Sequence, residues 1–218
     1  MTDAELPGLA RDTGTGASTM LLLLVVTVGA WLVVLFGPDT MMAPPAVFLA
    51  AWTVMMAAMM LPSALPFMLL YRRGASGVRT AWLATGYLMV WAAAGVPALW
   101  AWRLPTAVAG PLVLAAAGIY QFTPLKATCL KRCRTPADFL IQHWGKGALP
   151  LGALYGIWCL GCCWALMAVL VLAGAMGLAW VVGLAGLVAL EKLAPRGILW
   201  ARIAGAAFLI AAITMGVA

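Results

Sequence analysis

Three cysteines lie within five positions of one long apolar segment, at Cys159, Cys162 and Cys163. Each residue of a helix advances by about 100°, so the three thiols fall within an arc of roughly 100° and point to one side. Soft thiolate ligands suit Cu(I), and closed thiolate sites also suit zinc or an iron–sulfur cluster. The alternative is that Gly161, Cys162 and Cys163 are small residues that let membrane helices pack closely. The spacing leaves both interpretations open.

A second group of sulfur atoms lies in an earlier apolar segment. Met55 and Met59 are four residues apart, as are Met56 and Met60, and the four thioethers fit within an arc of roughly 140° on a helix. Methionine is also a flexible filler of cores, so such a stripe is more often packing than a metal site. If residues 46–70 and 148–172 both cross a membrane, however, the two sulfur groups lie at about the same depth. We therefore predict one shared metal site, formed by Met55, Met59, Met60, Cys159, Cys162 and Cys163.

Other candidate ligands lie outside these two segments. Cys129 and Cys133 are either a metal station at the inner surface, a reduced pair without function, or a lipid-modified pair. Glu191 ends an apolar segment beside Lys192, so it is either a carboxylate at the membrane interface or a harder ligand and proton acceptor. The single histidine, His143, excludes a multi-histidine site. Motifs of the common hydrolases and nucleotide-binding enzymes are absent from the sequence, so we do not expect an enzyme.

The elements that must position these residues are strongly apolar. The chain of 218 residues is 66% hydrophobic and only 9% charged, with a mean hydropathy of +1.06. Apolar segments near the roughly 20 residues that cross a bilayer recur along it. We expect an all-α, polytopic bundle in the lipid bilayer with about seven spans, or six as the alternative. The expected spans are residues 19–36, 46–70, 80–102, a fourth that ends near 122, 148–172, 178–190 and 198–217.

Charge places the expected bundle in the membrane. The net charge of +7 lies mostly in short connections, where Lys and Arg set orientation rather than bind nucleic acid. The excess of Lys and Arg in the connections on one side of the expected bundle predicts a cytoplasmic amino terminus. We expect residues 1–18 to be a disordered cytoplasmic tail and residues 19–218 to be a single transmembrane domain. A basic cytoplasmic connection is expected at about 123–147.

Two short helices are expected within that connection, lying at the inner membrane surface. Thr123 precedes Pro124, as at the start of a helix, and residues 124–134 then place Leu125, Cys129 and Cys133 on one stripe, opposite a face rich in Lys and Arg. Residues 135–138 have the form of a capping box and predict the second start.

Three blocks of the sequence resemble a known family. They are Trp52-x-x-Met55-x-x-Ala58-Met59-Met60-x-Pro62, then Tyr120-x-x-Thr123-Pro124-Leu125-Lys126-x-x-Cys129-Leu130-x-x-Cys133-Arg134-x-Pro136, then Cys159-x-Gly161-Cys162-Cys163-Trp164-x-Leu166-Met167, with Glu191-Lys192 after them. On these residues the chain resembles bacterial integral membrane proteins described as predicted metal-binding, of otherwise unknown function. The resemblance covers about residues 46–192. It implies a multi-span protein of the inner membrane that binds a metal, and copper follows from the ligand chemistry.

The leading hypothesis is a copper-handling membrane protein. It binds Cu(I), with zinc as the alternative, through the predicted Met and Cys ligands, with Glu191 as a further candidate. It passes the ion to or from Cys129 and Cys133, and a soluble metal-binding protein is the expected partner. A second hypothesis is a thiol redox protein that cycles Cys162 with Cys163 or Cys129 with Cys133, although adjacent cysteines form strained disulfides. A third is a structural or assembly subunit in which Met and Cys only pack.

Overall fold

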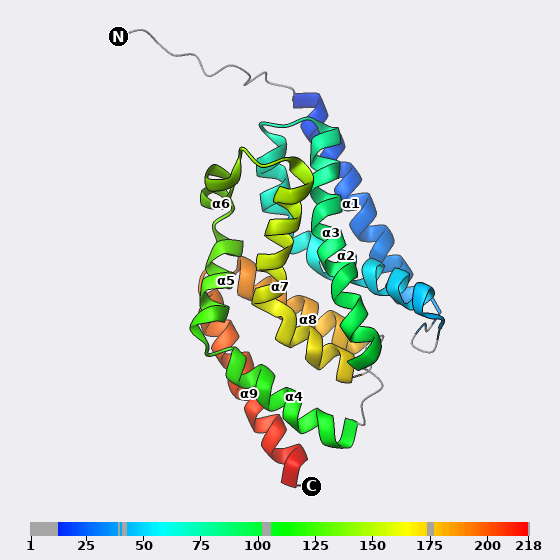
Figure 1. The fold of residues 1–218 in the computed structure, drawn as a ribbon, viewed down its shortest axis with the longest axis vertical. Coiled ribbons are helices and arrows are strands. Elements are labelled where there is room, and N and C mark those ends of the chain that lie inside the picture. Colours follow the sequence, from blue (N-terminus) through cyan, green and yellow to red (C-terminus); the bar gives the residue numbers. More distant parts are fainter. Residues whose placement is uncertain (1–12, 39, 41–42, 102–105, 174–176, 218) are drawn as a thin grey trace.

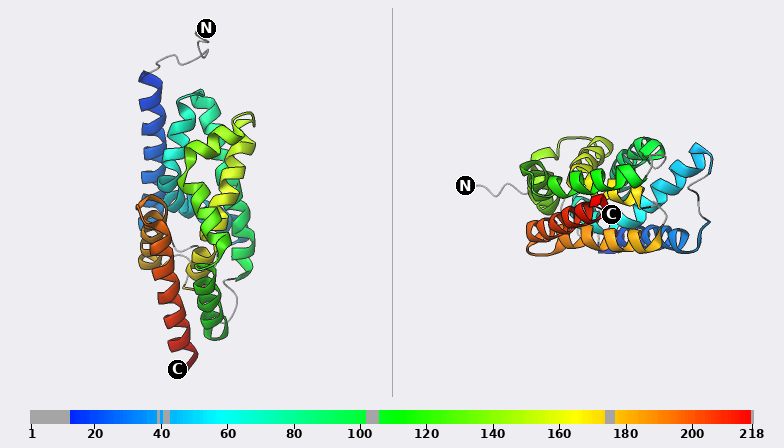
Figure 2. Two further views of the ribbon diagram at one scale, coloured as in Figure 1. Left: turned by 90° about the vertical axis from the view of Figure 1, so that its left-hand side faces the viewer. Right: turned by 90° about the horizontal axis from the view of Figure 1, so that it is seen from below.

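The computed structural model describes residues 13–38, 40, 43–101, 106–173 and 177–217. Within these ranges the chain forms nine helices and no strand, which confirms the all-α prediction. The helices are α1 (Thr13–Phe36), α2 (Pro45–Arg72), α3 (Gly77–Ala101), α4 (Thr106–Tyr120), α5 (Pro124–Arg134), α6 (Pro136–His143), α7 (Ala148–Leu172), α8 (Leu178–Leu193) and α9 (Gly197–Val217). Helix α1 begins near one end of the long axis and α9 ends at the other (Figures 1 and 2).

The expected apolar segments coincide with helices of the structure, but the expected number of membrane spans is not supported. In the part of the chain that the structure describes, four helices are long and apolar enough to cross a membrane, namely α2, α3, α7 and residues 197–216 of α9. Helices α1 and α4 contribute shorter apolar stretches. The expected count of about seven spans therefore goes beyond what the structure supports. Of the expected tail, residues 13–18 belong to α1, and residues 1–12 lie outside the described ranges.

Helix α7 is held against α3 by backbone contact. A Cβ atom on Gly152 would lie 1.9 Å from the carbonyl oxygen of Leu83, and one on Gly86 would lie 2.1 Å from that of Leu149. Only glycine fits at such distances, so the two helices approach as closely as their backbones allow. They run in the same direction, as Figure 1 shows. This contact sets the position of the cysteines that α7 carries.

Helices α4 and α5 follow one another along α7, separated by a short turn at residues 121–123 (Figure 1). Thr123 caps α5 as expected, because its hydroxyl oxygen accepts a hydrogen bond from the Lys126 backbone N–H at 3.2 Å. The predicted capping box at 135–138 does not form: the Thr135 hydroxyl donates to the Lys131 carbonyl oxygen instead. Helix α5 packs beside α7. Its expected place at the inner membrane surface stays a prediction.

Helix α8 crosses the molecule to the start of α9, and α9 then packs along α4 (Figures 1 and 2). The end of α8 is fixed by Arg134 of α5, which donates to the carbonyl oxygens of Glu191 at 2.7 Å and Lys192 at 3.2 Å. A cation at a helix carboxyl end satisfies carbonyls that have no partner within the helix. Helix α2 joins this assembly through Phe67, whose ring stacks on that of Tyr155 of α7 at 3.9 Å.

Candidate metal centre

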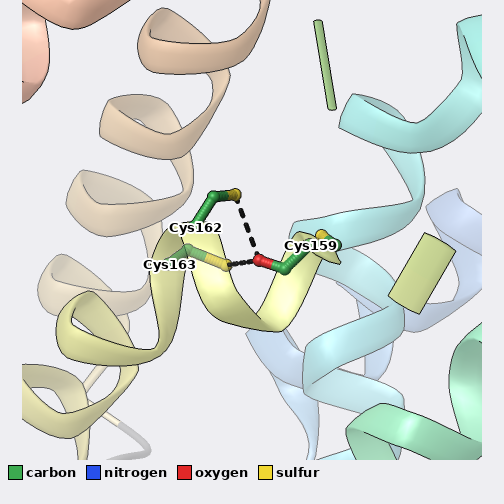
Figure 3. Close-up of side chains that lie close together, drawn as sticks. All are labelled: Cys159, Cys162 and Cys163. Carbon is green, nitrogen blue, oxygen red and sulfur yellow. Dashed lines mark hydrogen bonds between the residues drawn. The ribbon is translucent and has the colours of Figure 1, made fainter. Parts of the chain in front are cut away.

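The three cysteines of α7 form one buried cluster. The sulfur atoms of Cys159, Cys162 and Cys163 lie within 4.8 Å of one another, and each side chain is at most 1% exposed. The Cys162 and Cys163 thiols both donate to the carbonyl oxygen of Cys159, at 3.1 and 2.9 Å (Figure 3). Thiolates bonded at about 2.3 Å to one ion lie up to about 4.6 Å apart. The cluster therefore fits a single ion after small side-chain rotations.

Cys159 has partners that favour a negative charge on its sulfur. The ammonium group of Lys192, from α8, lies 2.8 Å from this sulfur atom, and the hydroxyl of Tyr87, from α3, lies 3.1 Å from it. Lys192 also donates to the Ser63 hydroxyl of α2 at 3.1 Å. A cation and a hydroxyl beside a buried sulfur stabilise the thiolate, which is the form that binds metals and reacts as a nucleophile.

Helix α5 brings the other two cysteines to the same place. The Cys133 thiol lies within hydrogen-bonding reach of Cys159 and Cys162, and these bonds together with burial raise its pKa well above the ordinary value. The Cys129 sulfur would lie 2.9 Å from a Cβ atom on Gly161, and burial raises the pKa of this thiol. A thiol with a raised pKa keeps its proton until a metal displaces it. All five cysteines of the chain therefore lie around α7, so Cys129 and Cys133 are not separate from the α7 cluster as expected. Their position at the inner surface stays a prediction.

A buried ion pair lies beside the thiols. The Lys126 ammonium is 2.6 Å from a carboxylate oxygen of Glu191, and the two side chains are 2% and 1% exposed. Gln121 donates to the other carboxylate oxygen at 3.3 Å, and Lys126 also donates to the Cys162 carbonyl oxygen. The interpretation of Glu191 as a carboxylate at the membrane interface is wrong, because the side chain is inside the protein. Its role as a metal ligand stays a prediction, and both of its oxygens already have partners.

The methionines of α2 are buried in the same core as the thiols. Met55, Met59 and Met60 are at most 3% exposed. The Met60 carbonyl oxygen accepts a hydrogen bond from the Tyr87 hydroxyl at 3.4 Å, and that hydroxyl contacts Cys159. These contacts connect the backbone of α2 to the cluster, and the three methionines belong to the same buried core as the cysteines of α7. The shared Met and Cys site therefore stays a prediction.

An apolar cavity of about 730 Å³ lies beside α7. Gly161 and the buried Cys129 line it, together with the exposed side chains of Leu125, Ile157 and Trp164. Of the five cysteines, Cys129 is the one among the residues that line this cavity. His143 has no part in the site: its ring stacks on Phe139 and its Nδ1 lies 2.9 Å from the Phe139 carbonyl oxygen.

Three residues of the site were not predicted from the sequence: Lys126, Lys192 and Tyr87. Both lysines had been assigned to exposed connections because of their charge, yet they are 1% and 6% exposed. Tyr87 lies in the expected span 80–102, and nothing in its spacing indicates that it is fully buried against Cys159.

The fold and the site together define a class of protein. An all-helical chain that gathers free, buried thiols around one helix, with a lysine beside the most central sulfur, has the donor set of proteins that hold soft metal ions. The chain belongs to the PpoB2 family, described as copper chaperone, whose sequence pattern it matches over residues 49–215. No curated protein and no solved structure matches the chain. The family match is consistent with the expected metal-binding family, and copper is the metal that the family description and the thiol cluster support.

Proposed function

We propose that this protein is a membrane copper chaperone that holds Cu(I) on the thiols of α7 and passes it to a partner protein. The observation that carries the proposal is the buried cluster of Cys159, Cys162 and Cys163. It occurs in a chain of the copper chaperone family, and the matched residues include every cysteine of the sequence. The ion is transferred unchanged, so the protein is not an enzyme.

The chemistry of the donors supports Cu(I) over other ions. Soft thiolates select Cu(I), whereas Cu(II) prefers nitrogen and oxygen donors in tetragonal geometry. A Cu(I) ion with two thiolates carries one net negative charge, and Lys192 supplies one positive charge at 2.8 Å from Cys159. Burial of a site is less costly when its charges balance. Zinc, which favours closed four-coordinate thiolate sites, is the alternative ion.

The setting is the inner membrane of a bacterium. Four long apolar helices support a membrane location, and α1, α4 and α8 complete the proposed count of about seven spans. We keep residues 19–218 as one domain with a cytoplasmic amino terminus. Lys126 and Lys192 are buried, so they do not serve as evidence for this orientation. The proposal of a cytoplasmic amino terminus depends on residues such as Arg72, Arg73 and Arg79.

Transfer involves the remaining sulfur atoms. Cys129 and Cys133 receive the ion from the α7 cluster or deliver it there, and a soluble metal-binding protein exchanges copper with them. The apolar cavity that ends at Cys129 supports α5 as the side of access. Met55, Met59 and Met60 are the proposed thioether ligands on the other side, where Tyr87 connects α2 to Cys159.

Metal analysis tests the proposal. The full chain is purified without oxygen, loaded with Cu(I), separated from free ion and analysed for copper and zinc. We expect copper well above background in the wild type, and its loss in the Cys159→Ser/Cys162→Ser/Cys163→Ser variant with the helical content retained. Background copper in the wild type, or unchanged copper in the triple variant, contradicts the proposal.

A second measurement tests the methionines. Met55→Leu/Met59→Leu/Met60→Leu conserves the volume of the core, so each change costs under about 1.5 kcal/mol. If the thioethers bind copper, this variant competes less well than wild type against a Cu(I) chelator. The matched control replaces three exposed methionines, Met20, Met89 and Met215, and leaves the affinity unchanged. Equal affinity of both triple variants removes the methionines from the site.

A further inference from the structure

Cys159 and Cys162 have the spacing of a disulfide as well as that of a metal site. They are three residues apart on α7, with Leu160 and Gly161 between them, which is the C-x-x-C arrangement. Residues three apart on a helix have Cα atoms about 5 Å apart, inside the range of about 4.4–6.8 Å that disulfides span. Their sulfur atoms already lie within 4.8 Å of each other (Figure 3). A disulfide between them therefore requires side-chain rotation and no unwinding of the helix.

The other two pairs on α7 suit a disulfide less well. Cys162 and Cys163 are adjacent, and the Cα atoms of adjacent residues are about 3.8 Å apart, which is below the disulfide range. Cys159 and Cys163 are four residues apart, so their Cα atoms are about 6.2 Å apart, toward the upper end of that range. Cys162 is therefore the better partner for Cys159.

The surroundings of the pair favour an attack by Cys159 on an oxidant. The Lys192 ammonium at 2.8 Å and the Tyr87 hydroxyl at 3.1 Å stabilise its thiolate, which is the nucleophilic form. Both cysteines are at most 1% exposed, so a protein thiol carrier does not reach them. The oxidant has to be small, and it has to be uncharged because a buried charge is costly. Hydrogen peroxide has both properties.

We propose that Cys159 and Cys162 form a reversible disulfide, with a peroxide as the oxidant, and that the disulfide form does not bind copper. The Cys159 thiolate attacks one peroxide oxygen and the O–O bond breaks. The hydroxide that leaves takes a proton from Lys192, which gives water and a sulfenic acid on Cys159. The Cys162 sulfur then attacks the sulfenic sulfur, the S–O bond breaks, and the Cys162 proton leaves with the hydroxyl group as a second water. The two sulfurs lose two electrons, and these reduce one peroxide to two waters.

The disulfide takes two of the three sulfur atoms away from the α7 cluster. Cys163 is then the one thiol left in it, so the oxidised chain does not take up Cu(I). A dithiol, which is itself oxidised to a disulfide, restores both thiols and the uptake of copper. The inference rests on the proposed function and adds the regulation of that site.

Thiol counting tests the formation of the disulfide. The metal-free full chain in detergent is treated briefly with a small excess of hydrogen peroxide, the peroxide is removed, and the thiols are counted after unfolding. We expect the five thiols of the wild type to fall to three, and dithiothreitol to restore five. Retention of all five thiols in the treated protein would overturn the inference.

Serine variants identify the pair. Cys162→Ser should stop at the Cys159 sulfenic acid, which a cyclic diketone reagent traps, and Cys162→Ala serves where the serine variant does not keep its helical content. The matched control is Cys163→Ser, because the Cys163 thiol donates to the same Cys159 carbonyl oxygen as the Cys162 thiol does. This control should still lose two thiols, as should Cys129→Ser/Cys133→Ser. A disulfide that forms without Cys162, or that fails to form in either control, would assign the chemistry to another pair.

Copper binding separates this inference from the proposed function. Cu(I) is added without oxygen to the reduced wild type, to the oxidised wild type freed of peroxide, and to the oxidised protein after dithiothreitol treatment and its removal. We expect copper in the first and third samples and background copper in the second. Equal copper in all three samples refutes the switch and leaves the proposed function intact. Background copper in the reduced sample refutes the proposed function, whereas the thiol counts still show whether the disulfide forms.

Discussion

Removing the charge of Glu191 is expected to destabilise the protein without releasing its copper. The Lys126–Glu191 distance of 2.6 Å corresponds to an attraction of about 6 kcal/mol at an effective dielectric constant of about 20. Desolvation of the two groups offsets much of this. Glu191→Gln keeps the shape and an acceptor for Lys126 but leaves a buried cation without a counter-charge. Breaking a buried pair in this way costs about 3–5 kcal/mol.

The assay is unfolding in detergent, followed by the fluorescence of the eleven tryptophans. We expect Glu191→Gln to lower the free energy of unfolding by about 3–5 kcal/mol. Lys126→Met/Glu191→Leu removes both charges and should recover most of that loss. The control Lys131→Met removes an exposed lysine from the same helix and should change stability by no more than about 0.5 kcal/mol.

Two results would refute this reasoning. A loss below about 1 kcal/mol in Glu191→Gln would mean that water or a rearrangement compensates Lys126, so the pair would not be buried in solution. A folded Glu191→Gln protein that no longer binds copper would make the carboxylate a ligand. The structure favours retention of copper, since the two carboxylate oxygens contact Lys126 and Gln121.

Three further predictions concern accessibility, reactivity and packing. Cys129 should react with a maleimide before Cys159, because it lines the cavity whereas Cys159 is fully buried, and peptide mass spectrometry gives the order; the reverse order would contradict this. Lys192→Met should slow the alkylation of Cys159 on the order of tenfold, since the thiolate is the reactive form and loses its counter-ion; an unchanged rate would dismiss the role of Lys192. Gly152→Ala should destabilise the α3–α7 contact by about 1–3 kcal/mol in the same unfolding assay. Gly183→Ala is its control and should not destabilise.

The helices could largely be predicted from the sequence, because a long apolar segment that is bounded by polar residues directly shows where a helix begins and ends. Residues 148–172 were expected as one span, and α7 has these bounds. The starts of α5 and α9 were also predicted to within a residue, at Pro124 from the Thr123–Pro124 signal and at 198 from the start of the last apolar segment. The clustering of Cys159, Cys162 and Cys163 followed from helical periodicity alone, because all three lie on one helix.

The arrangement of α5 could not be predicted in the same way, because side-chain type was used to decide which face is buried. The expected apolar stripe was Leu125, Cys129 and Cys133, with Lys126 on the polar face. In the structure Leu125 is 59% exposed, and the buried stripe is Lys126, Cys129, Leu130 and Cys133, spaced i, i+3, i+4 and i+7. The period was correct, but the direction of the buried face was wrong by about 50°, or half a residue, because a lysine was taken to require water.

Two physical signals in the sequence do point to the partner of that lysine. Lys126 lies in the first turn of α5, where the positive end of the helix dipole disfavours a cation. A lysine at this position therefore indicates a carboxylate nearby that compensates its charge. Glu191 is the one acidic residue within the apolar segments from 148 to 217, and Lys192 cannot face it because adjacent helical residues point about 100° apart. A carboxylate there needs a cation from another helix, and Lys126 meets that need. Pairing the two places α5 beside the end of α8, and Lys192, pointing elsewhere, is then free to meet Cys159. The thiols of α5 and α7 therefore lie close together where Lys126 of α5 pairs with Glu191 of α8 and also donates to the Cys162 carbonyl oxygen of α7.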